Sequence, residues 1–273
     1  MVIKSLKNDD WLIFHSWAKK EGWTISFQEQ RLFQNQWRPS FFALWEQGHC
    51  CGFVSVVIYK TSGWIGNLLV HPSKRGNGYG SQLFDFAIGL LESNQSERIW
   101  LTASEQGEPL YRRRGFVPVD KIMRWVGSGT QQQSKQDKNV SSTALTQLIE
   151  LDYQCWKESR RPLLAILADD GIILNEEKSL ALLQPGPDFW QLGPWLTSQP
   201  DTQEARQLLD NVSKRVPEDT PVVMDIIESS GLDLLLRQYG FEATGQNKLM
   251  CKSRDSVDNL TGIIALASLG SIG

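Results

Sequence analysis

The sequence predicts an α/β protein with a mixed sheet, built from two halves that are each flanked by helices. Three observations lead to this prediction. A short apolar run at 64–70 passes through a glycine-rich turn into an amphipathic segment at 79–91. A polar segment interrupts the chain between Gly127 and Ser142. The stretch at 110–116 has a counterpart at 234–241, so the second half is expected to repeat the first.

The first half is expected to begin with a helix and two paired strands. Asp9 and Asp10 precede apolar residues at helical spacing between Trp11 and Ala18, which favours a helix with an acidic first turn. Apolar and aromatic residues at 41–45 and 52–59 predict two strands, joined by a turn near Gln47. The order helix, strand, strand, strand then leads into the glycine-rich turn.

The glycine-rich turn separates a predicted strand at 64–70 from a predicted helix with an apolar stripe at 83–91. Gly76, Gly78 and Gly80 therefore lie at a helix start, where unpaired amides and the helix dipole favour an anion of pyrophosphate size. No Gly-Lys-Ser/Thr follows, and the spacing is not G-x-G-x-x-G, which argues against ATPases and dinucleotide-binding proteins. By itself the triplet is equally compatible with a tight surface turn.

A second motif identifies the turn by resemblance. Val70-x-Pro72-x-x-Arg75-Gly76-x-Gly78-x-Gly80 resembles the acyl-CoA-binding motif of the GNAT acyltransferases. Ile99–Thr102 and then Leu110–Phe116 resemble that family's fifth strand, its fourth helix and its Leu-Tyr-x-x-x-Gly-Phe ending. The resemblance implies two tandem GNAT-like domains, each a mostly antiparallel sheet flanked by helices.

The resemblance also assigns roles to individual residues. Backbone groups of Leu68, Leu69 and Val70 would pair with the pantetheine arm of acetyl-CoA. The pyrophosphate would be held by amides of Arg75, Gly76, Asn77, Gly78, Tyr79, Gly80 and Ser81, with Lys74 and Arg75 adding positive charge. Tyr111 occupies the family's acid position, whereas an isolated tyrosine at this place would ordinarily be read as a packing residue.

The general base is not identified by the sequence. An attacking amine must be neutral, and a free lysine-like amine titrates near pH ~10.4, so a proton acceptor is needed. Many GNAT enzymes carry a glutamate on the fourth strand, but 64–70 contains no carboxylate. Glu46, Glu105 and Glu108 lie near strand ends or Tyr111 and remain candidates beside a water chain. The aromatic stretch with Trp23, Phe27, Phe33 and Trp37 falls where the family builds the acceptor side, although core packing explains such residues equally.

Composition restricts the class of partner. The chain has 273 residues, 41% of them hydrophobic, and a net charge of −3, which suits two soluble domains and argues against nucleic acid or an anionic membrane as partner. Four cysteines without C-x-x-C spacing, two of them adjacent, and three scattered histidines predict neither a disulfide framework nor a metal site. No signal peptide or apolar run of ~20 residues is found, so a cytoplasmic location is expected.

We expect domains at 1–126 and 143–273, joined by a polar linker at 127–142. The second domain is expected to be degenerate, because Leu236 stands where Tyr111 stands in the first, and the expected strand-to-helix turn at 192–200 lacks the Arg-x-x-Gly-x-Gly pattern. The segment 261–269 is expected to form a final strand. The polar positions in this half that are candidates either to face the acceptor or to form structural ion pairs are Asp152, Arg160, Asp225 and Glu228.

The sequence thus predicts an N-acetyltransferase that moves an acetyl group from acetyl-CoA to the primary amine of a small molecule or peptide, by direct attack and without a metal. Two alternatives remain open. One is a transferase of a longer acyl or of an aminoacyl group, of which the aminoacyl form would need a basic face for tRNA that the chain lacks. The other is a non-catalytic acyl-CoA sensor, which the absent strand carboxylate favours and Tyr111 disfavours. Oligomeric state is not predicted.

Overall fold

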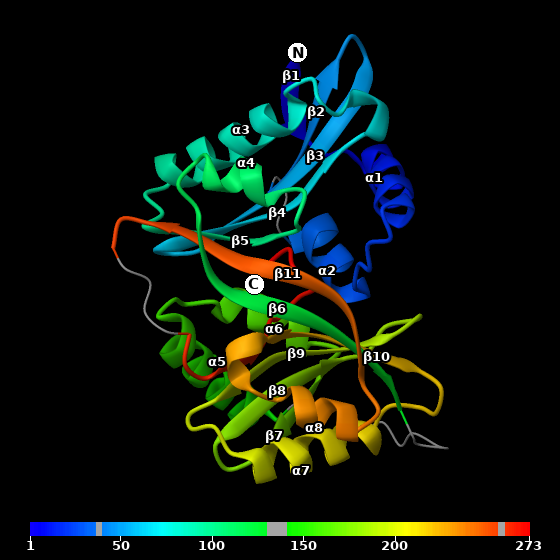
Figure 1. Ribbon diagram of the computed structural model, residues 1–273, viewed down its shortest axis with the longest axis vertical. Coiled ribbons are helices and arrows are strands. Elements are labelled where there is room, and N and C mark those ends of the chain that lie inside the picture. The colour runs from blue at the N-terminus through cyan, green and yellow to red at the C-terminus, as the bar shows by residue number, and fades with distance from the viewer. Residues whose placement is uncertain (37–39, 130–140, 256–259) are drawn as a thin grey trace.

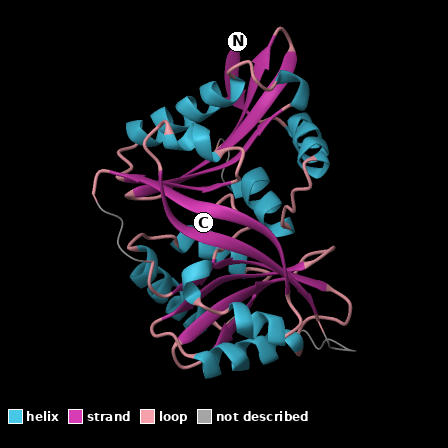
Figure 2. Ribbon diagram, in the orientation of Figure 1, coloured by secondary structure: helices cyan, strands magenta, loops and turns pink. Residues whose placement is uncertain are grey.

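The computed structural model describes residues 1–36, 40–129, 141–255 and 260–273. Within these residues one 12-stranded sheet runs through the whole molecule, with helices on its faces (Figures 1 and 2). This arrangement confirms the predicted mixed sheet flanked by helices. The expected linker at 127–142 falls mainly on residues 130–140, which lie outside the described residues.

The first half of the chain contains strands β1 to β6. Its elements are β1 (Val2–Ser5), α1 (Asn8–Lys20), α2 (Phe27–Arg31), a π-helical turn η1 (Leu32–Gln36), β2 (Phe41–Glu46), β3 (His49–Ile58), β4 (Ser62–Val70), a 3₁₀ turn η2 (Pro72–Lys74), α3 (Tyr79–Ser93), β5 (Arg98–Ala103), α4 (Glu108–Arg112) and β6 (Val117–Ser128). The helices and strands predicted in this half are confirmed, with ends that differ by a few residues. The predicted order is wrong at its start, because the half begins with the strand β1 and not with a helix. No apolar run predicts β1, whose four residues are exposed or half-buried and are held by pairing with β2. The acidic start of α1 is real, since Asp10 accepts a hydrogen bond from the Lys7 amide at 2.7 Å.

The second half repeats the same order of elements. It contains α5 (Ser142–Trp156), α6 (Arg161–Ala168), β7 (Ile172–Asn175), β8 (Ser179–Gln184), β9 (Trp190–Thr197), α7 (Thr202–Ser213), β10 (Pro221–Ile227), a 3₁₀ turn η3 (Glu228–Ser230), α8 (Asp233–Gln238), β11 (Glu242–Ser253) and β12 (Ile263–Ala265). In both halves three antiparallel strands are followed by a helix, a strand that pairs in parallel with the third, a short helix and a long strand.

The two halves exchange their long strands. β6 follows β5 in the chain but pairs with β10, and β11 follows β10 but pairs with β5, both in antiparallel fashion. β6 and β11 also pair with each other along most of their length. Figure 1 shows them crossing the middle of the molecule, one green and one orange. Neither half can therefore complete its sheet without the other.

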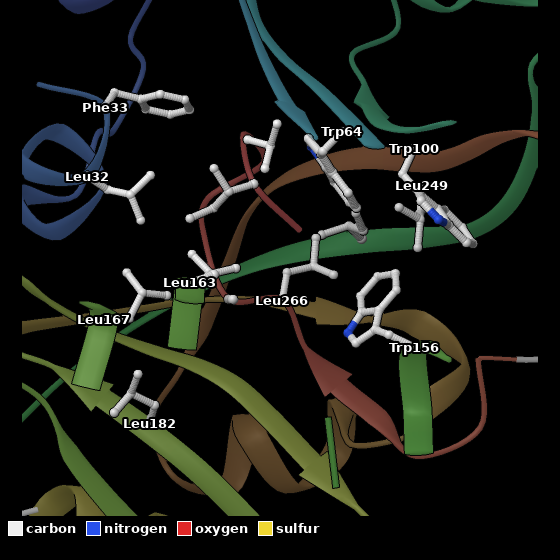
Figure 3. Packing of buried hydrophobic residues seen from close by; sticks show 14 of the residues in the cluster. Leu32, Phe33, Trp64, Trp100, Trp156, Leu163, Leu167, Leu182, Leu249 and Leu266 are labelled. Carbon is white, nitrogen blue, oxygen red and sulfur yellow. The ribbon is translucent and has the colours of Figure 1, made fainter. Parts of the chain in front are cut away.

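A shared core lies where the halves meet. Trp64 and Trp100 of the first half pack edge to face against Trp156 of α5, with ring centroids 6.1 and 5.5 Å apart. Figure 3 shows these three indoles beside Leu266. Two further cores are separate from this shared one. One lies between the sheet and helices α3 and α4, and the other lies between the sheet and helices α7 and α8. Burial of large aromatic side chains from both halves makes the interface part of the folding core.

The prediction of a strand-to-helix turn at 192–200 is wrong, because most of that stretch belongs to β9, and α7 begins only at Thr202. The reason is burial: β9 is buried along its whole length, and Pro194 sits where the pairing with β8 shifts register between Ala181 and Leu183. A proline is tolerated in a strand at such an irregularity, where no ladder hydrogen bond is lost. The expected final strand at 261–269 is present but shorter, as β12 covers only Ile263–Ala265.

Candidate active site

A gap opens between β4 and β5, the two parallel neighbours of the first half. Residues 62–64 of β4 pair with residues 98–100 of β5. Beyond Trp64, the edge of β4 that faces β5 has no strand partner among the described residues. The opposite edge of β4 stays paired with β3 as far as Val70. Backbone groups of Leu68, Leu69 and Val70, the residues predicted to pair with pantetheine, thus lie along a strand with an open edge.

A bulge in β4 widens this gap. The register against β3 jumps from Gly66 opposite Ser55 to Leu69 opposite Phe53, and Asn67 inside the jump has a φ of 51°. Asparagine is one of the few residues other than glycine that adopts this left-handed conformation readily. Bulges bend a strand and redirect its side chains. Here the bend leads β4 away from β5 at the point where a ligand would enter.

The open edge forms one wall of a groove of about 760 Å³. The groove collects almost all of the residues predicted to bind acyl-CoA: Leu68, Leu69, Val70, Arg75, Gly76, Gly78, Tyr79, Gly80 and Ser81. Asn77 does not line it, because its side-chain amide donates to the carbonyls of Lys74 and Arg75, each at 3.1 Å, and braces the turn. Tyr111 lies on the opposite wall, on α4.

The glycine-rich turn leads directly into α3. Gly76 and Gly78 have φ values of 79° and 81°, which explains why glycine stands at both positions. Gly78 caps α3 without any side-chain hydrogen bond, so the amides of the first turn have no intrahelical acceptor and face the groove. Helix amides at the positive end of the dipole are suited to a pyrophosphate.

Two side chains of the turn already have partners. Arg75 contacts Glu21 at 2.5 Å and donates to the Val70 carbonyl at 3.2 Å, and both Arg75 and Glu21 line the groove or its rim. Tyr79 donates its hydroxyl to Glu46, and this hydrogen bond raises the pKa of the Tyr79 phenol to about 12. Glu46 therefore anchors the start of α3, and its role as general base is not supported by its surroundings.

Tyr111 is held in one position by close packing. Its ring lies 4.7 Å from Phe84 between centroids, and it packs near Phe116 as well. Gly107 lies against the other side of the phenol, since a Cβ at this glycine would stand 2.9 Å from the Tyr111 hydroxyl. Burial raises the pKa of Tyr111 to about 12, so the phenol stays protonated at neutral pH.

A smaller cavity of about 170 Å³ adjoins the groove. Four residues line both spaces: Trp23, Leu68, Ser104 and Tyr111. The cavity has the volume that binds a benzene-sized molecule. Of the aromatic residues expected on the acceptor side, Trp23 lines the cavity, Phe33 belongs to the core and Phe27 lies elsewhere on the surface, while Trp37 lies outside the described residues.

The cavity contains a carboxylate that the sequence did not single out. Glu29 on α2 is only 4% exposed, and burial raises the pKa of its carboxyl group. The Asn67 amide lies 3.5 Å from one of its oxygens. In the sequence, Ser26-x-x-Glu29 has the form of a helix capping box, and the Ser26 hydroxyl indeed accepts a hydrogen bond from the Glu29 amide. This local role is the only signal that the sequence carries for Glu29.

Arg124 also lines the cavity, but its charge is balanced. Its guanidinium makes a bidentate contact with Asp225, with both distances 2.8 Å, and donates to the Leu269 carbonyl at 3.0 Å. Asp225 is buried, and among the described residues its carboxylate reaches the site through Arg124. Since this pair is close to neutral, the ionisation state of Glu29 sets the charge of the cavity.

The other candidates lie away from the cavity. Glu108 pairs with Arg112 and Lys248, both at 2.7 Å, which lowers its pKa. Glu105 lines the groove but not the cavity. Asp152 and Arg160 form a fully buried ion pair at 2.5 Å, and Glu228 pairs with Lys121 at the surface.

The described helices include none with the length and hydropathy of a membrane span. Nor do the described residues bring three histidine, cysteine, aspartate or glutamate side chains together in a metal-binding group.

Known proteins share both the motif and the fold. Residues 3–116 match the model of the acetyltransferase (GNAT) family. A holothin acyltransferase from Pseudoalteromonas sp. (strain SANK 73390) is 25% identical over 278 residues, which cover 96% of this chain and 91% of the relative.

Two solved structures align over nearly the whole chain. A candidate acetyltransferase from Pyrococcus horikoshii has a TM-score of 0.74 at 16% identity and covers 98% of this chain and 95% of its own. A tandem GNAT protein from the clavulanic acid biosynthesis pathway has a TM-score of 0.61 at 12% identity, with 94% and 99% covered. The family match over residues 3–116 identifies the first half of the chain as a GNAT acyltransferase domain that uses acyl-CoA. The two solved structures show that the same two-copy fold extends over the whole chain.

Proposed function

We propose that this protein transfers an acetyl group from acetyl-CoA to the primary amine of a small molecule, with Glu29 as proton acceptor and Tyr111 as hydrogen-bond donor to the leaving thiolate. One observation carries the proposal. The acyl-CoA groove and the carboxylate-lined cavity meet at Tyr111, which lines both. A thioester that enters along β4 would present its carbonyl to whatever occupies the cavity.

The groove supplies orientation. Amides of the α3 first turn would hold the pyrophosphate, and the free edge of β4 at Leu68–Val70 would pair with the pantetheine arm. Arg75 would exchange Glu21 for a phosphate oxygen. Fixed at both points, the thioester is brought close to the amine, and such alignment is among the largest contributions to catalysis.

The reaction needs one proton acceptor and one site for negative charge. The amine nitrogen forms a bond to the thioester carbon, the carbon–sulfur bond breaks, and the surplus amine proton passes to Glu29. The thiolate leaves beside the Tyr111 hydroxyl. Because a thiol ordinarily titrates near pH ~8.5 and the pKa of Tyr111 is about 12, Tyr111 donates a hydrogen bond and keeps its proton. The thiolate then takes a proton from solvent.

The charge in the cavity favours a basic acceptor. The Glu29 carboxylate brings negative charge to the cavity, where the guanidinium of Arg124 is already paired with Asp225. A protonated amine attracted to this charge releases its first proton to solvent and becomes neutral before it attacks. The proton that becomes surplus on attack then passes to Glu29, whose pKa burial raises. The volume of about 170 Å³ suits a group the size of a six-membered ring.

We also propose that the chain comprises two GNAT-like domains, at 1–126 and 143–273, that exchange their last long strands. The repeated order of elements supports this division. The first domain carries the groove, the cavity and Tyr111. The second supplies β11, Arg124's partner Asp225, and residues 269–271 of the cavity wall.

The test is release of CoA from acetyl-CoA by the full chain against a panel of ring-sized primary amines. We expect turnover with at least one amine and a loss of about 100-fold or more in kcat/KM for Glu29→Gln. Glu228→Gln, which alters an exposed carboxylate outside the site, is the matched control and should leave the rate unchanged. Binding of acetyl-CoA without turnover of any amine would support the sensor in place of the enzyme.

The length of the acyl group is a separate question. The full-length relative is named an acyltransferase without a stated chain length. We infer acetyl because Tyr111, which lines both the groove and the cavity, is buried and lies against Gly107, so its ring has no room to give way to a longer chain. Competition between acetyl-CoA and hexanoyl-CoA for the same amine measures this preference, and a higher kcat/KM for hexanoyl-CoA would overturn it.

A further inference from the structure

The end of the described chain builds part of the small cavity. After β12 the segment 266–273 turns back into the interface between the halves, where Figure 1 places the C-terminal label. Leu269, Gly270 and Ser271 line the cavity together with Glu29 and Tyr111. Residues more than 140 positions away in the sequence thus complete the expected acceptor site.

This segment is fixed to both strands that flank the gap. The Gly270 carbonyl accepts hydrogen bonds from the Trp64 indole of β4 at 3.2 Å and from the Thr102 hydroxyl of β5 at 2.8 Å. Gly66 of β4 touches the backbone of Ser271 so closely that a Cβ would come within 2.6 Å of its carbonyl oxygen. The backbone of Ser271 therefore cannot move further toward β4.

Ser271 is the unusual residue of this wall. It is 4% exposed, and its amide donates to the Ser268 hydroxyl at 3.1 Å. Its own hydroxyl is buried and forms no hydrogen bond of ordinary geometry with any described residue. The hydroxyl does lie close enough to the Glu29 carboxylate to lower the pKa of that group. Buried hydroxyl groups are nearly always paired with protein, water or ligand, because an unpaired one costs about 1–3 kcal/mol.

We propose that Ser271 is an acceptor-binding residue, whose hydroxyl forms a hydrogen bond with a polar group that the acceptor carries beside its reacting amine. The proposal rests on the proposed function, because it places the amine at Glu29. In a cavity of about 170 Å³ the two groups of the acceptor share one ring-sized space, so they are separated by only a few bonds. The acceptor class is therefore a vicinal amino alcohol or a similar amine with an adjacent hydrogen-bonding atom.

The experiment compares two acceptors that differ in one hydroxyl, 2-aminocyclohexanol and cyclohexylamine, in the parent and in Ser271→Ala. The parent should favour the amino alcohol by about 3- to 10-fold in kcat/KM, the usual worth of one hydrogen bond, and Ser271→Ala should remove the preference. KM for acetyl-CoA should stay unchanged. The melting temperature should not fall, because the hydroxyl forms no hydrogen bond of ordinary geometry within the part of the chain that the structure describes. A preference that survives in Ser271→Ala overturns the proposal.

The matched variant is Ser268→Ala, which removes a hydroxyl that accepts from the amides of Ser271 and Ile272. It should lower the melting temperature, because two buried amides lose their acceptor. The contrast separates a residue that holds the segment from one that faces the acceptor. A similar loss of stability in Ser271→Ala would mean that its hydroxyl serves the fold, which also contradicts the proposal.

If neither amine turns over, the proposed function fails for this class, and a measurement without turnover decides the position of Ser271. Ser271→Cys is treated with 2-aminoethyl methanethiosulfonate, a small cationic thiol reagent, beside Ser268→Cys. We expect a mixed disulfide at position 271, which lines the cavity, and none at position 268, which does not. Absence of labelling at position 271 under conditions that label exposed cysteines overturns the proposal.

Discussion

Replacing Gly107 with alanine would press a methyl group into the ring of Tyr111. The added Cβ would stand 2.9 Å from the hydroxyl oxygen and from one ring carbon, whereas ordinary contacts begin at 3.4 Å. The backbone of Gly107 is in the right-handed helical region and accepts alanine without strain. Phe84 and Phe116 confine the ring on its other side, so the phenol has to move by about 0.5 Å.

The expected kinetic effect follows from that displacement. A misplacement of about 1 Å in a catalytic arrangement costs roughly 100-fold, so half of it costs roughly 10-fold in kcat. Tyr111→Phe, which removes the hydrogen bond completely, should cost about 100-fold. The assay is CoA release at saturating acetyl-CoA and acceptor. Because the methyl group meets the phenol and not the phosphate-binding turn, KM for acetyl-CoA should change little.

Gly89→Ala provides the control, since a Cβ at this exposed position of α3 meets no atom within 4 Å. It should leave kcat intact and raise stability by about 0.5–1 kcal/mol through helix propensity. Full activity of Gly107→Ala would refute the claim that the position of Tyr111 is critical. A rise in KM for acetyl-CoA that accounts for the whole loss would show that the methyl group obstructs the groove instead.

Three further outcomes are expected. Glu29→Gln should be inactive yet more stable than the parent at pH 7–8. Burial raises the folded-state pKa of Glu29, so ionisation of this carboxyl group lowers the stability of the parent as pH rises. The melting temperatures of the two proteins should converge toward pH ~4.3, where unfolded glutamate also protonates. An equal or lower melting temperature at pH 8 contradicts this. Activity should persist to about pH 11, because burial raises the pKa of Tyr111 to about 12. A fall in activity centred near pH ~10, the ordinary pKa of a phenol, would mean that Tyr111 is not the hydrogen-bond donor. Arg75→Ala should raise KM for acetyl-CoA a few-fold. Glu21→Gln should lower this KM, since Glu21 competes with phosphate for Arg75. If both variants change KM in the same direction, that competition is excluded.

The groove could be predicted because its determinants are local. Gly76 and Gly78 have positive φ values, and α3 starts directly after them. Tyr111 lies four residues before Gly115 in the Leu-Tyr-x-x-x-Gly-Phe motif. Each of these features depends on a few consecutive residues. The only predicted residue of the turn that does not face the groove is Asn77, whose amide folds back onto the backbone.

The acceptor cavity could not be predicted because its determinants are tertiary. Burial raises the pKa of a glutamate, and Glu29 is buried by Asn67 of a strand bulge and by a segment at the far end of the chain. Sequence periodicity around Phe27 and Arg31 carries no information about either. The strand exchange is hidden for the same reason, since β6 and β11 could each have paired within their own half.

The segment after residue 262 explains how two similar halves come to differ. In both halves a parallel pair of strands splays apart, β4 from β5 and β9 from β10. In the second half β12 fills this gap and pairs with both strands, so the chain itself occupies the place that pantetheine would take in the first half. Backbone edges that open in one copy for a ligand are thereby satisfied in the other. The same segment then continues to Ser271 in the cavity of the first half. One stretch of chain therefore closes the gap of the second half and completes the cavity of the first.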